Sequence, residues 1–196
     1  MLVWLNGPFG VGKTQTAHEL QRRWPGSFVC DPEHLRFALH RMTPRELRGD
    51  FQDEPLWREG TRRTLARLLQ RRSGAVIVPM TVVVPQYLDE MVGELAREGF
   101  DVRHFTLMAS SRAVRRRLLN RGEGGASYGA RQLERCLREL EQPLFAQHVH
   151  TEGRSVEQVA EEVARQVGIT LEPRTTSRLN SIIRRWQVQW AHRRQD

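Results

Sequence analysis

Continuous apolar runs alternate along this chain with segments whose apolar residues recur at helical spacing. The runs predict strands over residues 1–6, 27–30, 75–80, 102–108 and 147–151. The run over 75–80 has the composition of a central parallel strand that is covered on both faces. The amphipathic segments predict helices over 15–23, 33–42, 56–72, 86–98, 111–120, 130–141 and 156–167. This alternation predicts an α/β fold with a parallel sheet.

A glycine-rich segment joins the first predicted strand to the first predicted helix. It reads G-P-F-G-V-G-K-T and has the form G-x-x-x-x-G-K-[ST] of a phosphate-binding loop, in the strand-to-helix context that the motif requires. Glycines let consecutive backbone N–H groups turn inward around an anion, and the next helix directs its positive end to the same place. We therefore expect nucleotide phosphates to bind at Gly7, Phe9, Gly10, Val11, Gly12, Lys13, Thr14 and Gln15.

Lys13 is the only lysine among the 31 Lys and Arg residues of the chain. A compact ammonium suits a position between phosphate groups better than a planar guanidinium does. We expect Lys13 to contact the β- and γ-phosphates and the Thr14 hydroxyl to bind Mg²⁺. The predicted cofactors are therefore ATP and Mg²⁺.

Two carboxylates, Asp31 and Glu33, follow the second predicted strand and have two interpretations. In the first, Asp31 caps the next helix, Pro32 occupies its first position, and Glu33 is favoured by the helix dipole. In the second, the carboxyl end of this strand lies beside the nucleotide crevice of an open α/β sheet. There a carboxylate can hold a Mg²⁺-bound water or accept a proton from an attacking hydroxyl. The two interpretations do not exclude each other.

The length of 196 residues suffices for one well-buried α/β core. A strand that starts at Met1 leaves no room for a signal peptide, and no run approaches the roughly 18 apolar residues of a spanning helix, so we expect a cytoplasmic protein. Cys30 and Cys136 lack metal-site spacing and are expected to be buried apolar residues. The net charge of +8 is typical of proteins with anionic partners, but without a nucleic-acid-binding signature we expect no nucleic acid.

Residues 45–55 are polar and turn-rich, and they predict a mobile segment over the site. Trp57 and Arg58 begin the next helix, where an aromatic ring beside a cation can hold a flat acceptor, although core packing of Trp57 is slightly favoured. The strand over 75–80 lacks the terminal acid of a Walker B motif, and Thr81 is the first polar residue after it. This pattern argues against a motor-type ATPase and leaves metal and water positioning to Thr14 and Asp31.

The helix predicted over 111–120 carries several arginines and leads into a glycine-rich segment. Flexible hinges and guanidinium groups are what a closing lid over a phosphoryl group needs, so we predict a lid near residues 115–129. Arg117 and Arg121 lie four residues apart on one helix face and are the expected phosphate contacts. The alternative is an exposed basic helix followed by an ordinary loop.

Beyond a linker over 169–176, the chain predicts a basic amphipathic helix over 177–194. Its apolar face is formed by Leu179, Ile182, Ile183, Trp186 and Trp190, and arginines fill much of the remaining surface. Such a helix suits peripheral contact with the inner face of the membrane, and it suits docking on its own domain or in a homodimer equally well. We therefore divide the chain into a nucleotide-binding domain over 1–168 and an appendage over 169–196.

The parallel strands, the first-turn phosphate loop, the missing Walker B acid and the Arg-rich lid together resemble the nucleoside-monophosphate and shikimate kinase group. That resemblance implies a three-layer fold with a five-stranded parallel sheet in the order 2-3-1-4-5 and helices on both faces. A closer resemblance, to the bacterial tunicamycin-resistance protein family, is carried by W-L-N-G-x-F-G-V-G-K-T-Q-T over 4–16, D-P-E over 31–33, F-Q-x-x-P-L-W-R over 51–58, V-P-M-T over 78–81 and H-F-T-L-M-A-S over 104–110.

The second resemblance implies an ATP-binding protein that protects bacteria from tunicamycin, a uridine-containing nucleoside antibiotic with a fatty acyl chain. It also implies membrane association through the C-terminal helix. The expected activity is phosphorylation of the drug, with Lys13, Asp31, Arg117 and Arg121 as catalytic residues. The expected substrate contacts are Asp31, Glu33, Phe51, Trp57, Arg58 and Thr81. Two alternatives are sequestration of the drug at the membrane with ATP gating the lid, and a housekeeping nucleoside or nucleotide kinase.

Overall fold

The computed structural model describes residues 1–125, 127–145 and 147–173. Its centre is a five-stranded sheet in which all neighbouring strands are parallel. The order is β2-β3-β1-β4-β5, which confirms the predicted order 2-3-1-4-5. The strands are β1 (Leu2–Asn6), β2 (Phe28–Val29), β3 (Val76–Pro79), β4 (Val102–Met108) and β5 (His148–His150).

The first strand lies in the middle of the sheet, and every one of its residues is buried. Leu2 pairs with Val76 of β3 on one side and with Val102 of β4 on the other. A strand with neighbours on both edges and helices on both faces needs a continuous apolar sequence, which β1 and β3 both have. The phosphate loop therefore follows directly from the buried central strand of the sheet.

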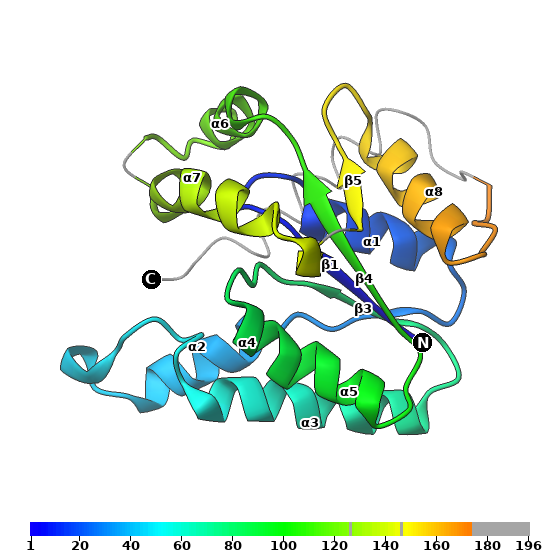
Figure 1. Ribbon diagram of the computed structural model, residues 1–196, viewed down its shortest axis with the longest axis horizontal. Helices are drawn as coiled ribbons and strands as arrows, with labels where there is room; N and C mark the ends of the chain where they lie inside the picture. Colours follow the sequence, from blue (N-terminus) through cyan, green and yellow to red (C-terminus); the bar gives the residue numbers. More distant parts are fainter. Residues whose placement is uncertain (126, 146, 174–196) are drawn as a thin grey trace.

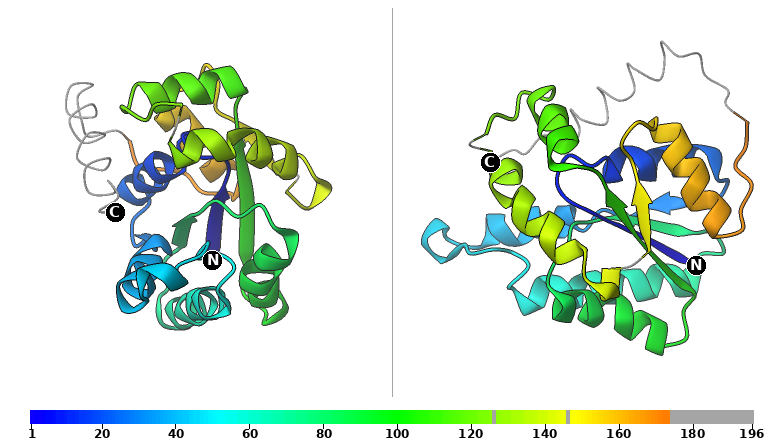
Figure 2. Two further views of the ribbon diagram at one scale, coloured as in Figure 1. Left: turned by 90° about the vertical axis from the view of Figure 1, so that its left-hand side faces the viewer. Right: turned by 45° about the horizontal axis from the view of Figure 1, so that its top comes forward.

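Helices cover both faces of the sheet, as Figure 1 shows, with α1 and α8 on one face and α3, α4 and α5 on the other. Two apolar cores, one on each face, fill the space between the layers. In both views of Figure 2, α6 and α7 lie at the end of the sheet to which the strands point. The helices are α1 (Lys13–Arg23), α2 (Glu33–Met42), α3 (Pro55–Arg71), α4 (Pro85–Leu88), α5 (Glu94–Arg97), α6 (Ser111–Leu119), α7 (Tyr128–Leu140) and α8 (Val156–Gln166), with short 3₁₀ turns at Arg45–Leu47 and Pro143–Phe145.

Serine side chains begin three of these helices. Ser110 and Ser127 each accept a hydrogen bond from a backbone N–H in the first turn of α6 and α7. Ser155 and Gln158 form a capping box at the start of α8. The caps fix where α6 and α7 start, and those starts border the site described below.

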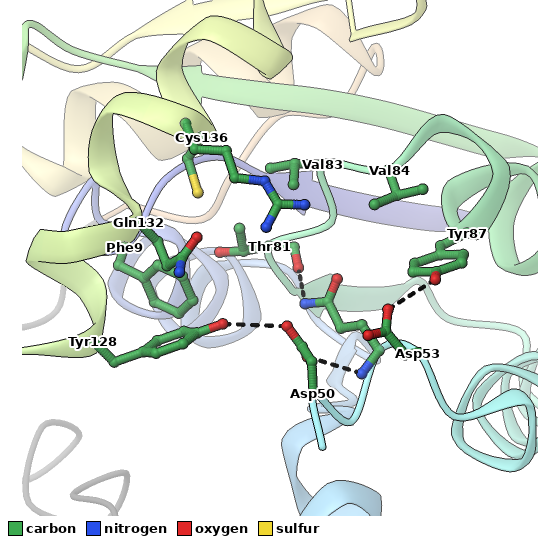
Figure 3. A pocket seen from close by; sticks show the side chains of 12 residues that line it. Phe9, Asp50, Asp53, Thr81, Val83, Val84, Tyr87, Tyr128, Gln132 and Cys136 are labelled. Carbon is green, nitrogen blue, oxygen red and sulfur yellow. Dashed lines mark hydrogen bonds between the residues drawn. The ribbon is translucent and has the colours of Figure 1, made fainter.

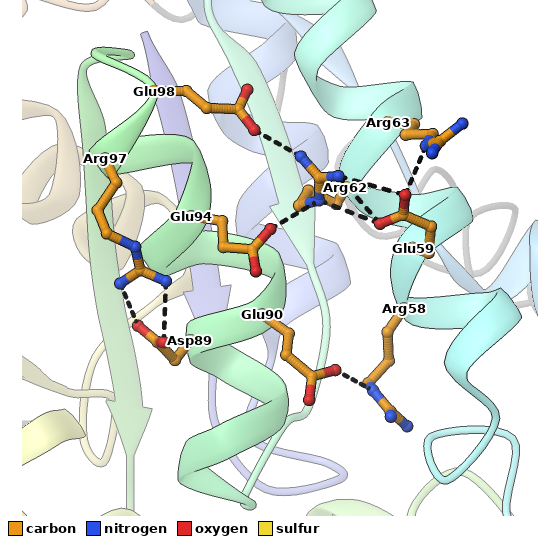
Figure 4. Close-up of polar contacts among 9 residues, drawn as sticks. All are labelled: Arg58, Glu59, Arg62, Arg63, Asp89, Glu90, Glu94, Arg97 and Glu98. Atoms are coloured by element: carbon orange, nitrogen blue, oxygen red, sulfur yellow. Dashed lines mark hydrogen bonds and ion pairs between the residues drawn. The ribbon is translucent and has the colours of Figure 1, made fainter.

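The helix predicted over 86–98 is not a uniform α-helix, because a π-helical segment, Asp89–Gly93, separates α4 from α5. Arg97 forms an ion pair with Asp89, and a Cβ at Gly93 would lie 2.0 Å from a carboxylate oxygen of Asp89. Arg62 of α3 pairs with carboxylates on this helical stretch as well, as Figure 4 shows. Apolar periodicity cannot reveal a single widened turn of this kind.

Residues 169–172 continue from α8 along the domain instead of leaving it. Leu171 is buried, and Arg23 and Glu172 exchange hydrogen bonds between Arg23 Nε and the Glu172 carbonyl and between the Glu172 N–H and the Arg23 carbonyl. The predicted basic helix over 177–194 lies outside the described residues. Among the residues that the structure describes, no helix is long and apolar enough to cross a membrane.

Candidate functional site

The phosphate loop turns through three glycines with positive φ: 137° at Gly7, 80° at Gly10 and 114° at Gly12. A side chain at Gly7 would also collide with the backbone, because a Cβ there would lie 2.5 Å from the carbonyl oxygen of Leu107. At Gly12, by contrast, a Cβ would meet nothing within 4 Å. The loop therefore needs glycine at these three positions for its backbone conformation. The space beside the backbone of Gly12 is open.

Asn6 and Thr81 fasten the start of this loop to the chain that follows β3. The buried Asn6 side chain accepts hydrogen bonds from the N–H groups of Gly7 (2.8 Å) and Val82 (2.9 Å) and donates one to the Val82 carbonyl (2.7 Å). Thr81 Oγ1 donates to the Gly7 carbonyl at 2.8 Å. Thr81, predicted as a substrate contact, therefore also supports the loop, and the role of Asn6 was missed because it ends an apolar run.

Lys13 is buried, with 9% of its surface exposed, and it lies inside the loop. Its Nζ donates hydrogen bonds to the carbonyl oxygens of Gly7 (2.9 Å) and Pro8 (3.0 Å). Burial lowers the pKa of Lys13 to about 8. A desolvated ammonium whose hydrogen bonds go to neutral carbonyls has much to gain from an anionic ligand.

Charged side chains from two other segments act on this ammonium. After burial, the charges of Glu33 and Asp31 are among the influences that raise the pKa of Lys13, and the charge of Arg121 lowers it. The structure therefore brings the predicted carboxylates and the predicted lid arginine near the phosphate loop. Burial also lowers the pKa of Arg121. Lys13 and Arg121 are therefore both cations that burial has partly removed from water. Such a pair of cations is typical of an anion-binding site.

Arg117 is held differently from Arg121. Its guanidinium donates hydrogen bonds to the carbonyl of Val11 (3.0 Å), to Thr151 Oγ1 (2.8 Å) and to the Thr151 carbonyl (2.8 Å). Arg117 thus ties α6 to the phosphate loop and to the end of β5. In this structure it supports the loop from the side, whereas Arg121 affects Lys13 directly.

Asp31 has the capping contact expected of it, because its Oδ1 accepts a hydrogen bond from the Glu33 N–H at 2.9 Å. The helix α2 itself begins at Glu33, and Pro32 occupies the preceding cap position. Asp31, Glu33 and Thr14 are all partly exposed, so each is accessible to a ligand. In the described part of the chain, no three His, Cys, Asp or Glu residues are grouped as metal ligands.

Trp57 is fully buried, which gives it the core-packing role and leaves no ring face for a ligand in this structure. Its Nε1 donates to the Pro32 carbonyl at 3.0 Å, and its ring meets Phe51 edge-on at 4.9 Å between centroids. Trp57 therefore positions the Asp31–Glu33 segment from behind. Arg58 is also buried, with its guanidinium 4.2 Å from the Tyr87 ring centroid and its Nε paired with Glu90.

A cleft opens beside the phosphate loop, between α7, the segment over 50–53 and the chain after β3, as Figure 3 shows. Three hydrogen bonds connect its walls: from Tyr128 Oη to Asp50 Oδ2 (3.3 Å), from Tyr87 Oη to Asp53 Oδ1 (2.8 Å) and from Gln52 Nε2 to the Thr81 carbonyl (2.8 Å). The cleft is lined by Phe9, Asp50, Gln52, Asp53, Thr81, Val83, Val84, Tyr87, Tyr128, Gln132, Arg135 and Cys136.

Of this lining, only Phe9 and Thr81 were predicted from the sequence as site residues. The other residues come from loops and helix starts that carry no motif, and tertiary packing brings them together. The only signal was the polar character of residues 45–55, which was interpreted as a cover over the site. Thr81 is the one predicted substrate contact in this lining, which does not include Asp31, Glu33, Phe51, Trp57 or Arg58.

Comparisons with known proteins agree with this geometry. A family model described as an AAA domain matches residues 2–143. The tunicamycin resistance protein of Deinococcus radiodurans is 39% identical, with a TM-score of 0.76 over 88% of this chain and 98% of that chain. A gluconokinase of Sinorhizobium meliloti (15% identity, TM-score 0.59, 98% and 97% covered) and a shikimate kinase of Bacteroides thetaiotaomicron (18%, 0.55, 86% and 99%) share the fold.

None of the curated proteins matches the sequence. The kinases just described are less than 25% identical and bear on the fold alone. The family model and the Deinococcus relative each extend over most of the chain, and the residues that the family model matches include the phosphate loop and α7. With its AAA-type phosphate-loop domain and its kinase-like fold, this chain belongs to the tunicamycin-resistance protein family.

Proposed function

We propose that this protein binds Mg²⁺-ATP at the phosphate loop and transfers the γ-phosphoryl group to a hydroxyl of tunicamycin or a related nucleoside. The observation that carries the proposal is Lys13, a desolvated ammonium in a glycine loop that adjoins a cleft. The chemistry of the loop fits a nucleotide, because glycines with positive φ, a helix start and a buried ammonium converge there.

The residues of this chain hold and polarise the reacting groups. The backbone N–H groups from Gly10 to Thr14 and the ammonium of Lys13 would hold the phosphates, and the Thr14 hydroxyl would be a ligand of Mg²⁺. Mg²⁺-ATP supplies the phosphoryl group and neutralises part of its charge. Arg121 adds a second positive charge at the same place, where stabilisation of developing negative charge contributes most to the rate.

Asp31 is the residue we assign to the attacking hydroxyl, either as proton acceptor or as partner of a metal-bound water. Its charge is one of the influences that raise the pKa of Lys13, which supports a role for Asp31 on the phosphate side of the site. Its contact with the Glu33 N–H restricts the orientation of the carboxylate. A carboxylate so held does not have to reorganise when the reaction begins, and such preorganisation is what phosphoryl transfer requires of a protein.

The cleft is the proposed place for the molecule that accepts phosphate, and it is called the acceptor cleft from here on. It shares Phe9 with the phosphate loop, so a ligand in it lies beside the phosphates. The Deinococcus relative carries the name of tunicamycin resistance, which supports this drug as the acceptor. We place the protein in the cytoplasm, with peripheral contact to the membrane through residues 177–194 as a part of the proposal.

Measurement of both products of ATP turnover tests the activity. With tunicamycin present, the protein should form ADP without releasing inorganic phosphate, and Lys13→Met should abolish ADP formation. Release of one inorganic phosphate for each ADP would show hydrolysis and contradict the transfer. Tight drug binding without ADP formation would favour sequestration, and preference for an ordinary nucleoside or nucleotide would favour a housekeeping kinase.

A further inference from the structure

The acceptor cleft differs in charge from the phosphate loop that it adjoins. Its lining contains two carboxylates, Asp50 and Asp53, and among the described residues that line it Arg135 is the single cation. The phosphate end of the site, in contrast, has the ammonium of Lys13 in the glycine loop, and the positive charge of Arg121 acts on it. An acceptor that carries phosphate or carboxylate needs cations where it binds, and bidentate arginines are the usual solution. The lining of this cleft has two carboxylates and one guanidinium, and its net charge is therefore negative.

Both carboxylates are exposed and keep hydrogen-bond capacity for a ligand. Asp50 accepts a long bond from Tyr128 Oη (3.3 Å) and one from the Gln52 N–H (3.1 Å), and Asp53 Oδ1 accepts one from Tyr87 Oη (2.8 Å). An ionised carboxylate has about four acceptor positions, so both groups can accept hydroxyl or N–H donors in addition. Figure 3 shows Asp50 and Asp53 directed toward tyrosines on different walls.

Apart from Asp50, Asp53 and Arg135, the lining is uncharged. Gln132 can both donate and accept a hydrogen bond, and Val83 and Val84 are apolar. The rings of Phe9 and Tyr128 meet edge-on at 5.5 Å between centroids and form an aromatic corner beside the phosphate loop. This lining fits a molecule with a flat or apolar part and several hydroxyl groups.

We infer that Asp50 and Asp53 determine specificity by rejecting anionic acceptors, so that the cleft takes uncharged polyhydroxylated nucleosides and excludes their phosphorylated forms. The inference rests on the proposed function, since it treats this cleft as the acceptor site. Like charges placed together in the cleft repel each other, whereas the same carboxylates accept hydrogen bonds from sugar hydroxyls. A nucleoside and its own monophosphate differ only by the charged phosphate group, so they are the matched probes for this inference.

The test measures binding alone. The full chain is loaded with Mg²⁺ and a non-hydrolysable ATP analogue, and uridine and uridine monophosphate are titrated into the wild type and into a double variant, Asp50→Asn with Asp53→Asn. We expect uridine monophosphate to bind the double variant at least about 10-fold more tightly than the wild type, and uridine to gain nothing. The control replaces Asp89 and Asp101 by Asn, because both form exposed ion pairs away from the cleft lining.

The control variant changes the net charge by the same amount and should leave both affinities as in the wild type. The inference is overturned if uridine monophosphate binds the cleft variant no more tightly than the wild type, and this includes binding that is undetectable in both. It is also overturned if the control gains as much as the cleft variant. Failure of phosphoryl transfer would contradict the proposed function and leave this comparison intact, because no step of it requires turnover.

Discussion

Arg58 donates a hydrogen bond from Nη1 to the backbone carbonyl of Gln52, from behind the wall of the acceptor cleft. The same guanidinium pairs with Glu90 and lies over the ring of Tyr87, which belongs to another wall. Arg58 was predicted to contact the substrate, but the structure gives it contacts with two residues that line the cleft. Its role in this structure is to position that lining.

Replacement of Arg58 by Met should therefore weaken tunicamycin binding and leave nucleotide binding unchanged. Loss of a buried charged hydrogen bond releases Gln52 and Tyr87, and we expect the drug affinity to fall about 10-fold. Calorimetric titration of the drug and of an ATP analogue measures both affinities.

Arg62→Met is the matched control for Arg58→Met. Arg62 lies one turn further along α3 and pairs with Glu59, Glu94 and Glu98, as Figure 4 shows, but it contacts no residue that lines the cleft. Its loss should reduce stability and spare drug affinity. Equal loss of drug affinity in the two variants would show that general loosening of α3 is responsible.

Gly129 at the start of α7 packs against the phosphate loop. A Cβ at this position would lie 2.9 Å from Cβ of Phe9, closer than side chains normally approach. We expect Gly129→Ala to displace Phe9 and to lower the affinity for an ATP analogue several-fold, although Ala favours a helix by about 1 kcal/mol. In Gly124→Ala the new Cβ meets nothing within 4 Å, so nucleotide affinity should stay unchanged. Equal affinities in the two variants would mean that α7 does not constrain the loop.

His104 makes the stability of the fold depend on pH. Burial, together with the nearby His148, lowers the pKa of His104 from 6.5 to about 4. Between these values the unfolded chain binds more protons than the folded one, so stability falls as the pH drops from 6.5 to 4 and is constant above 6.5 as far as this group is concerned. The contribution is up to about 3 kcal/mol.

Denaturant unfolding at several pH values measures this effect. His104 Nε2 has no hydrogen-bond partner among the described residues, so His104→Leu removes a buried polar group as well as the titration. In this variant the free energy of unfolding should depend less on pH between 4 and 6.5. An unchanged pH profile would show that other groups cause the acid sensitivity.

The Asp31→Asn variant distinguishes the catalytic interpretation of Asp31 from the capping interpretation. If it accepts the proton of the attacking hydroxyl or holds a metal-bound water, Asp31→Asn should reduce the rate on the order of 10²-fold with nucleotide binding retained. If its contact with the Glu33 N–H is its whole role, the variant should lose roughly 1 kcal/mol of stability or less and keep its rate. Single-turnover rates and thermal unfolding of the same variant decide between the two.

The strands and the phosphate loop were predictable because local sequence determines them. The runs around β1 and β3 are apolar throughout, and Gly7, Gly10 and Gly12 have the backbone angles that the motif requires. The order of the strands came from the family resemblance, since periodicity does not encode which strands pair.

The acceptor cleft was not predictable in the same way. Asp50 and Tyr128 are 78 positions apart, and their hydrogen bond exists only because α7 packs against the phosphate loop. Trp57 had both a ligand-stacking and a core-packing interpretation, and nothing in its local sequence excluded either of them. Its burial depends on Phe51 and Pro32, which approach it only in the folded chain.

The most direct test of the central claim is the intact mass of tunicamycin after incubation with the protein, ATP and Mg²⁺. We predict a product heavier by one phosphate group, formed by the wild type and absent with Lys13→Met. Unchanged drug, in the presence of demonstrated drug and nucleotide binding, would contradict phosphoryl transfer and show that the protein acts by binding alone.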